Sequence, residues 1–202
     1  MNPKERIRIE LIRSASIYQS ILMDYDYLIY SEAFKSEPHY ILTAHGDNYA
    51  HLTGVHSLVS ASEFYSRCLN GTLTVSDFDF VDKYQSEKSV RNTVRKKLSS
   101  FSYLPHLFSQ GLKAEESFSK GKVHCFIAAA NNNVTLGFVE TEEVLPKTLL
   151  KGNLISEKNS VDITLMLRRS RGSNKFDTIL HSDVNRFHTS HSNILSETLF
   201  LK

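Results

Sequence analysis

"KVHCFIAAANNNVTLGFVE", residues 122–140, is the stretch that decides the predicted fold class. Two apolar runs flank three consecutive asparagines, and asparagine tolerates the positive φ that tight hairpin turns require. Residues 123–140 therefore predict a β-hairpin. Further along, "VDITLMLRR" and "KFDTILHS" flank the turn-forming segment "SRGSN", which predicts a second hairpin over residues 161–182.

Upstream of the hairpins, the apolar residues follow a helical period. Pro3 after Asn2 is a typical helix start, and apolar residues then recur at three- and four-residue steps as far as about Asp24. The tyrosines of the polar stretch that follows, Tyr25, Tyr27 and Tyr30, are interpreted as lid residues over a core, and the alternative is that they stack on bases. This part of the chain therefore predicts one long helix.

Two more helices and a short strand are expected before the hairpins. Residues 39–45, "HYILTAH", are rich in β-favouring residues and precede a Gly-Asp turn, so they predict a strand. Ser60 and Glu63 have the spacing of a capping box, which predicts a helix over residues 61–69. "SEKSVRNTVRKKLSSF", residues 86–101, carries its apolar residues on one helical face.

Helices in the first half and strands in the second predict an α+β fold. The expected architecture is a helical N-terminal half packed on a small antiparallel sheet, which is formed mainly by the C-terminal half. The helices should cover one face of that sheet.

Composition limits the function without naming it. The chain of 202 residues has 24 Lys plus Arg against 22 Asp plus Glu, a net charge of +2 that neither demands nor excludes a polyanionic partner. Cys68 and Cys125 lack metal-ligand spacing, so we expect reduced, buried thiols, a cytoplasmic protein, no metal and no cofactor. No apolar run approaches the roughly 20 residues of a membrane span, so no membrane association is expected.

"NYAHLTGVHS", residues 48–57, is the first candidate for chemistry. If this segment is extended, His51 and Thr53 project to the same side, where an imidazole exchanges protons and a hydroxyl binds a phosphate oxygen. The structural alternative is that both side chains only satisfy backbone groups at a strand-to-helix corner. His45 and His56 flank the corner and are interpreted as solvent-facing turn residues.

"LPKTLLKGN", residues 145–153, is the second candidate. Lys147 and Lys151 are four residues apart and would share a helical face; with Thr148 they offer cationic and hydroxyl donors for a developing phosphate charge. The alternative is a solvated loop that Leu149 and Leu150 anchor to the core.

"LRRSRGSNK", residues 167–175, is the third candidate. Four positive charges surround one predicted hairpin tip, and guanidinium groups match the geometry of phosphate. Because strand side chains alternate, Arg168 and Arg169 should face opposite sides of the sheet. The alternative is a charged hairpin that serves only solubility.

Several of these motifs occur together in a known group of proteins. "HYILTAHGDNYAHLTGV", then "ASEFYSRCLNGTLTVSDFDF", and later "LGFVETEEVLPKTLLKG" with a final strand pair resemble phage- and mobile-element-associated domains of the Barnase-EndoU-ColicinE5/D-RelE-like (BECR) nuclease superfamily. The resemblance covers about residues 39–181. It divides the chain into an N-terminal helical segment (1–38), a BECR-like nuclease domain (39–182) and a C-terminal tail (183–202).

The resemblance implies a sheet whose concave face cleaves RNA without metal, often in bacterial conflict or toxin systems. His51 and Thr53 match the family's HLTG segment, and Thr148 and Lys151 match its PxTLLK segment, whereas the last hairpin matches more loosely. The expected catalytic groups are His51, Thr53, Lys151 and Arg168, and the expected substrate-binding groups are Thr148, Arg169, Arg171 and Lys175. His51 would act as acid or base, and the product would be a 2′,3′-cyclic phosphate.

Three hypotheses for the function follow. The leading one is a metal-independent endoribonuclease, a toxin that acts on tRNA or translating mRNA and is restrained by an inhibitor or antitoxin protein. The second is a catalytically inactive module with the same fold that binds RNA or protein. The third is a partner-regulated protein whose apolar tail, "NILSETLFL", docks onto an inhibitor or onto a second copy of the chain in a homodimer.

Overall fold

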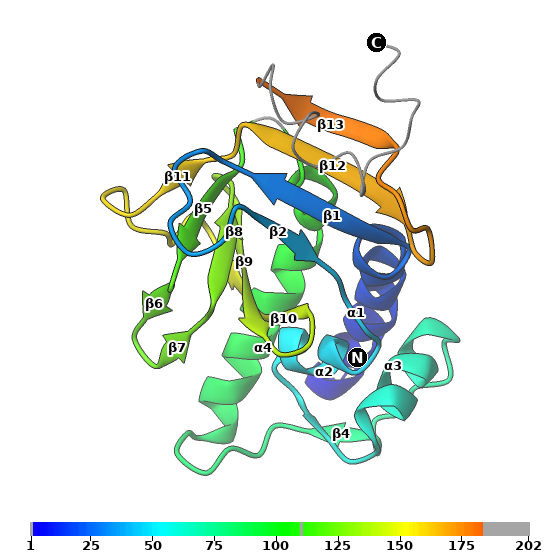
Figure 1. Cartoon of the computed structure of the whole chain (residues 1–202). Coiled ribbons are helices and arrows are strands. Elements are labelled where there is room, and N and C mark those ends of the chain that lie inside the picture. Colours follow the sequence, from blue (N-terminus) through cyan, green and yellow to red (C-terminus); the bar gives the residue numbers. More distant parts are fainter. Residues whose placement is uncertain (1, 110, 184–202) are drawn as a thin grey trace.

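A nine-stranded sheet forms the centre of this computed structural model, which describes residues 2–109 and 111–183. The strand order is β11-β5-β8-β9-β10-β2-β1-β12-β13, and two small two-stranded sheets, β3-β4 and β6-β7, lie outside it. The helices α1, α2 and α4 gather on one side of the sheet (Figure 1).

The helices are α1 (Pro3–Tyr18), continued by a π-helical turn (Gln19–Met23), α2 (Asn48–Thr53), α3 (Ala61–Leu69), α4 (Glu87–Phe101) and a 3-10 turn (Leu104–His106). The strands of the large sheet are β1 (Tyr25–Tyr30), β2 (His39–Leu42), β5 (Lys113–Glu116), β8 (Ile127–Ala130), β9 (Val134–Glu140), β10 (Val144–Lys151), β11 (Val161–Asp162), β12 (Leu165–Ser170) and β13 (Thr178–Ser182). The short strands are β3 (His56–Ser57), β4 (Phe78–Asp79), β6 (Ser119–Lys120) and β7 (Val123–His124).

The long helices begin where their capping residues predict. The side chain of Asn2 accepts a hydrogen bond from the Lys4 N–H, Ser60 caps α3, and Ser86 caps α4. Each cap satisfies a backbone N–H that has no partner within the helix. The predictions of the first helix, of 61–69 and of 86–101 are therefore confirmed.

Both predicted hairpins are present. β8 and β9 pair antiparallel around the asparagine turn, and β12 and β13 pair antiparallel around the arginine-rich turn. The β10 segment, in contrast, is a strand and not a helix, with a bulge between Pro146 and Thr148. Lysines in this segment therefore follow the two-residue period of a strand.

The prediction of a small sheet is wrong. The sheet has nine strands, and β1 and β2 from the helical half occupy its interior, between β10 and β12. The segment 25–30, interpreted as a polar lid, is a central strand whose residues 26–29 are buried. The polar residues of this strand misled the interpretation, because their hydroxyl and carboxylate groups have hydrogen-bond partners within the structure. The sheet is also not wholly antiparallel, since β10 meets β2 in parallel at Val144 and Leu42.

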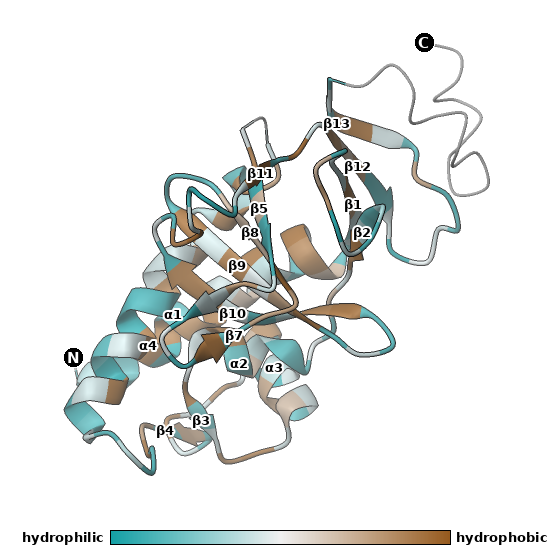
Figure 2. Cartoon of the chain, turned by 60° about the vertical axis from the view of Figure 1, so that its left-hand side comes forward, coloured by the Kyte–Doolittle hydropathy of each residue, from teal (hydrophilic) through white to brown (hydrophobic). Residues whose placement is uncertain are grey.

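The helices and the sheet enclose the main core, and the opposite face of the sheet carries smaller clusters. Tyr27 and Ile29 of β1 point into the main core, whereas Leu28 packs on the other face with Leu167 and Phe176. Figure 2 shows hydrophobic colour along β9 and long hydrophilic stretches on α4, as expected for one covered and one solvated surface.

The corner of residues 48–53 is the helix α2 and not an extended segment. Gly54 ends this helix at φ +76, a left-handed conformation that glycine adopts without steric cost. The side chain of Tyr49, a residue of this helix, is fully buried. Because side chains on a helix three or four apart share a face, His51 and Thr53 do not project together.

Two further expectations concern the thiols and the membrane. Cys68 and Cys125 are free and buried, as predicted. Within residues 2–109 and 111–183, no helix has both the length and the apolar character needed to cross a membrane.

Candidate active site

Asp26, a buried carboxylate on β1, is the centre of a cluster of polar side chains. Asp26 is 5% exposed and accepts a hydrogen bond from Arg169 Nε at 2.9 Å and from Arg171 Nη1 at 2.8 Å. The strand register explains the first contact, because Asp26 and Arg169 are direct partners across β1 and β12. Buried charge is tolerated only when it is paired, and here two guanidinium groups balance one carboxylate.

Thr43 completes the coordination of Asp26. Its hydroxyl donates to Asp26 Oδ1 at 2.6 Å, and its N–H donates to the Val144 carbonyl at 3.1 Å, just beyond the end of β2. Asp26 therefore lies where β1, β2, β10 and β12 come together. Strand parity places it on the face opposite the helices, with Leu28 and not with Tyr27.

His45 follows β2 in a turn, and three hydrogen bonds fix its backbone. Its N–H donates to Asn48 Oδ1 at 2.8 Å, and its carbonyl accepts from the Asn48 N–H and from the Tyr18 hydroxyl, at 3.1 and 2.6 Å. Burial raises the pKa of Tyr18, so this hydroxyl stays protonated and remains a donor. Gly46 lies against the Tyr65 ring, which a Cβ at this position would approach to 2.6 Å.

The imidazole of His45 bridges a carboxylate and a guanidinium. Nε2 contacts Glu143 Oε2, in the turn between β9 and β10, and Nδ1 contacts Arg171 Nη2 at 3.2 Å. A guanidinium only donates, so Nδ1 must accept and the imidazole proton lies on Nε2, directed at Glu143. The side chains of His45 and Glu143 are 45% and 47% exposed, so the pair is open to solvent.

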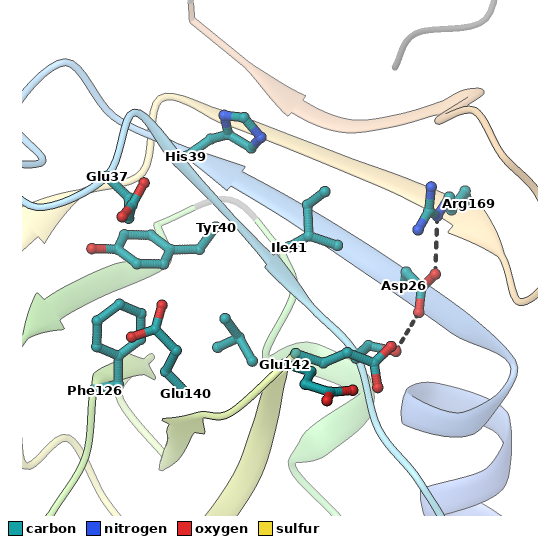
Figure 3. A pocket seen from close by; sticks show the side chains of 12 residues that line it. Asp26, Glu37, His39, Tyr40, Ile41, Phe126, Glu140, Glu142 and Arg169 are labelled. Atoms are coloured by element: carbon teal, nitrogen blue, oxygen red, sulfur yellow. Dashed lines mark hydrogen bonds and ion pairs between the residues drawn. The ribbon is translucent and has the colours of Figure 1, made fainter. Parts of the chain in front are cut away.

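A cavity of about 390 Å³ lies beside this cluster. Figure 3 shows Tyr40 and Phe126 towards one end of it and Asp26 with Arg169 at the other. The carboxylates of Glu37, Glu140, Glu142 and Glu143 also line it. The cavity thus combines aromatic walls, a guanidinium at one end and space for a group larger than a side chain.

The donor set of this cluster suits proton transfer and anion binding. It provides one imidazole paired with a carboxylate and two guanidinium groups, arranged around a buried Asp26. Among residues 2–109 and 111–183, no three His, Cys, Asp or Glu side chains lie close enough together to hold a metal ion.

His51 and Thr53 lie on the other side of the sheet. Their helix, α2, packs on β10 and contributes Leu52 and Ala50 to the core beneath the helices. His51 is exposed, and its backbone carbonyl accepts from Lys97 Nζ at 3.0 Å. Thr53 is fully buried and donates to the Ala50 carbonyl at 2.8 Å. The sheet therefore separates both residues from Asp26 and Arg169.

Thr148 and Lys151 lie in the second half of β10, away from Glu143. Thr148 is 6% exposed, and its methyl group lies close to Gly137 on the face that also carries Cys125. Lys151 is exposed and pairs with Val134 at the opposite end of β10 from Glu143. With about 3.3 Å per strand residue, the Cα atoms of Lys151 and Glu143 are roughly 25 Å apart.

The arginine-rich hairpin divides as predicted. Arg168 lies across from Tyr27 on the helix side and stacks over the Tyr25 ring at 4.2 Å, whereas Arg169 faces the other side. Arg169 and Arg171 both enter the cluster around Asp26. Lys175, beyond the hairpin tip, is exposed.

The structure thus brings together two of the eight predicted site residues, Arg169 and Arg171, and adds three that the sequence did not indicate, Asp26, His45 and Glu143. The partners of Asp26 are 143 and 145 positions away, and Glu143 is 98 positions from His45. The sequence contained one usable signal, a histidine directly before a Gly-Asp turn at the end of a predicted strand.

Comparison with known proteins gave one match. The model of the family phage-Barnase-EndoU-ColicinE5/D-RelE like nuclease4 matches residues 10–198. This match starts well before the resemblance recognised at residue 39, and it includes most of α1 and all of β1. Searches of the curated proteins and of the solved structures found no match to the chain.

Proposed function

The chain belongs to the phage-Barnase-EndoU-ColicinE5/D-RelE like nuclease4 family, and from this premise we propose that it is an endoribonuclease that works without a metal ion. In the proposed reaction the ribose 2′-hydroxyl attacks the adjacent phosphorus. The observation that carries the proposal is one imidazole held between a carboxylate, Glu143, and a guanidinium, Arg171.

His45 is the proposed general base. Its Nδ1 has a free lone pair once the Arg171 guanidinium turns from the imidazole to a bound phosphate. Glu143 accepts a hydrogen bond from Nε2–H, which fixes the tautomer and stabilises the imidazolium that forms when Nδ1 takes up a proton. General acid-base catalysis of this kind contributes about 10²- to 10⁴-fold in rate.

Arg169 and Arg171 are the proposed phosphate-binding groups. Both guanidinium groups are tethered to Asp26, which keeps them at the site while Arg171 exchanges the imidazole for a phosphate oxygen, and their side chains remain 21% and 32% exposed. Their remaining N–H groups can donate to the nonbridging oxygens of the phosphate, where negative charge increases in the transition state.

The bonds and protons of the proposed reaction balance. The 2′-oxygen forms a bond to phosphorus and its proton passes to His45 Nδ1, while the bond from phosphorus to the 5′-oxygen breaks. The 5′-oxygen takes a proton from water at this solvent-open site, and the imidazolium returns its proton to the solvent. The products are a 2′,3′-cyclic phosphate and a 5′-hydroxyl.

The biological role is part of the same proposal. A phage-associated nuclease family supports a toxin that cuts tRNA or translating mRNA in the cytoplasm, with an inhibitor protein that protects the producing cell. The tail sequence "NILSETLFL" was predicted to dock onto an inhibitor or a second copy, and it lies outside the described residues. That hypothesis stays a prediction: deleting residues 192–202 should change assembly without changing cleavage chemistry.

The experiment is cleavage of total tRNA and of a single-stranded RNA in EDTA, with the ends of the products mapped. We expect 2′,3′-cyclic phosphate ends, and no cut where the ribose at the cleavage site is 2′-deoxy. Ends with a 5′-phosphate, or cleavage only after a divalent metal is added, would contradict the proposal. Intact RNA together with salt-sensitive RNA binding would support the inactive module instead.

A further inference from the structure

The most exposed large hydrophobic side chain of the described residues lies away from the proposed active site. Tyr84 is 79% exposed, in the loop between β4 and α4. Because so much of this side chain is exposed, its aromatic ring is accessible to a ligand from solvent. Its backbone N–H donates to Asp82 Oδ1 at 2.8 Å, which ties the loop at this point.

Two lysines from different parts of the chain surround this ring. Lys83 Nζ lies 5.6 Å and Lys122 Nζ lies 5.7 Å from the ring centroid of Tyr84. Lys122 belongs to the turn between β6 and β7, which Gly121 closes at φ +59. The tertiary structure therefore places two ammonium groups within 6 Å of the centre of one exposed aromatic ring.

The hairpin of Lys122 connects this ring to the cavity of the proposed site. Phe126 lines that cavity and follows Lys122 by four residues, about 13 Å of extended chain. Between them, the carbonyl of His124 accepts a hydrogen bond from Lys147 Nζ at 2.7 Å, which adds a third cation along the same path. Lysine side chains therefore lie along the chain between Tyr84 and the aromatic end of the cavity, where Glu37 and Glu140 lie beside Tyr40 and Phe126 (Figure 3).

We propose that Tyr84 with Lys83 and Lys122 is a binding site for single-stranded RNA, which holds a part of the substrate a few nucleotides away from the cut. This inference rests on the proposed function for the identity of the ligand. An exposed aromatic ring stacks on any base, and flanking lysines contact the phosphates on either side, a combination typical of sequence-tolerant single-strand binding. Helical RNA hides its base faces and would bind more weakly.

The test measures binding separately from cleavage. The probe is a fluorescent single-stranded RNA of about 12 nucleotides whose riboses are all 2′-O-methylated, so that no 2′-hydroxyl can attack. We expect Tyr84→Ala to weaken binding roughly 10-fold and Tyr84→Phe to leave it nearly unchanged, because the ring carries the stacking. Lys122→Ala should reduce the slope of log affinity against log salt by about 0.7.

Lys158→Ala is the matched control, because it removes the same charge from an exposed position in the loop between β10 and β11. Equal affinity of the wild type and Tyr84→Ala for the probe would overturn the inference. The inference would also be overturned if dextran sulfate displaced the probe equally well from the wild type and from Tyr84→Ala. Charge alone would then hold the RNA, and the same surface would bind an acidic protein. A protein that binds the probe through Tyr84 but cleaves no RNA would overturn the proposed function and leave this site standing.

Discussion

His45 and His51 lie six positions apart in one short segment, yet the structure gives them different surroundings. The imidazole of His45 contacts Glu143 and Arg171, from two distant parts of the chain. His51 is exposed on α2, where its backbone carbonyl accepts a hydrogen bond from Lys97 Nζ. The comparison shows that a histidine becomes suited to proton transfer through the groups that the tertiary structure places against it.

Replacing each histidine with alanine tests this difference between His45 and His51 most directly. The structure-based proposal predicts a loss of about 10²- to 10⁴-fold in kcat/KM for His45→Ala. The sequence-based hypothesis predicts that loss for His51→Ala instead. RNA cleavage in EDTA by the two purified variants decides between them, and far-ultraviolet circular dichroism checks that both are folded.

The arginines allow the same contrast within one hairpin. Arg171→Ala should lower kcat/KM by roughly 10²- to 10³-fold, because it removes a donor to the developing phosphate charge. Arg168→Ala, which removes a guanidinium that stacks on Tyr25 on the helix side, should act mainly on stability. A larger loss of activity in Arg168→Ala than in Arg171→Ala would favour the sequence-based assignment of Arg168.

Asp26 links the His45 region to protein stability. Asp26→Asn keeps the shape of the side chain but leaves two guanidinium groups without their counter-charge, so the free energy of unfolding should fall by about 3 kcal/mol. Urea denaturation measures this change. Asp162→Asn, at an exposed pair with Lys113, is the control and should change the free energy by less than about 0.5 kcal/mol. Equal effects would mean that the Asp26 cluster is no more than a surface ion pair.

The smallest expected effect on stability concerns Lys97, which contacts the backbone of His51. Burial lowers the pKa of Lys97 from 10.5 to about 8, and its ammonium supports the carbonyl of His51. Between pH 8 and 10.5 the unfolded chain keeps a proton on this lysine that the folded chain has lost, so stability should rise with pH in that window. Because Lys97 is partly exposed, we expect a gain on the order of 1 kcal/mol after screening.

Comparison with Lys97→Met isolates that contribution from other groups that titrate in alkaline solution. The variant should lack the rise in the free energy of unfolding between pH 8 and 10.5. A variant whose stability follows the wild-type curve would show that Lys97 titrates normally. RNA cleavage by Lys97→Met at neutral pH should stay close to the wild-type rate, because the contact supports a backbone carbonyl.

What could be predicted from the sequence were the features that a few neighbouring residues determine. Asn2, Ser60 and Ser86 cap the helices they precede, and the asparagine and arginine-rich turns close their hairpins. The family resemblance was also recognised from the residues, and the family match confirms it. Helix caps and turns satisfy their hydrogen bonds within about three or four residues, so the local sequence is enough to determine them.

Only the tertiary structure decided the size of the sheet and the composition of the candidate site. The sequence of β1 was interpreted as a polar segment because no residue near Asp26 in the sequence is its partner. The arginines that pair with Asp26 are 143 and 145 positions away. The register between β1 and β12 brings these groups together, and the turn between β9 and β10 brings Glu143 to His45. Strand pairing across such separations depends on the packing of the whole sheet, which no local pattern of residues contains.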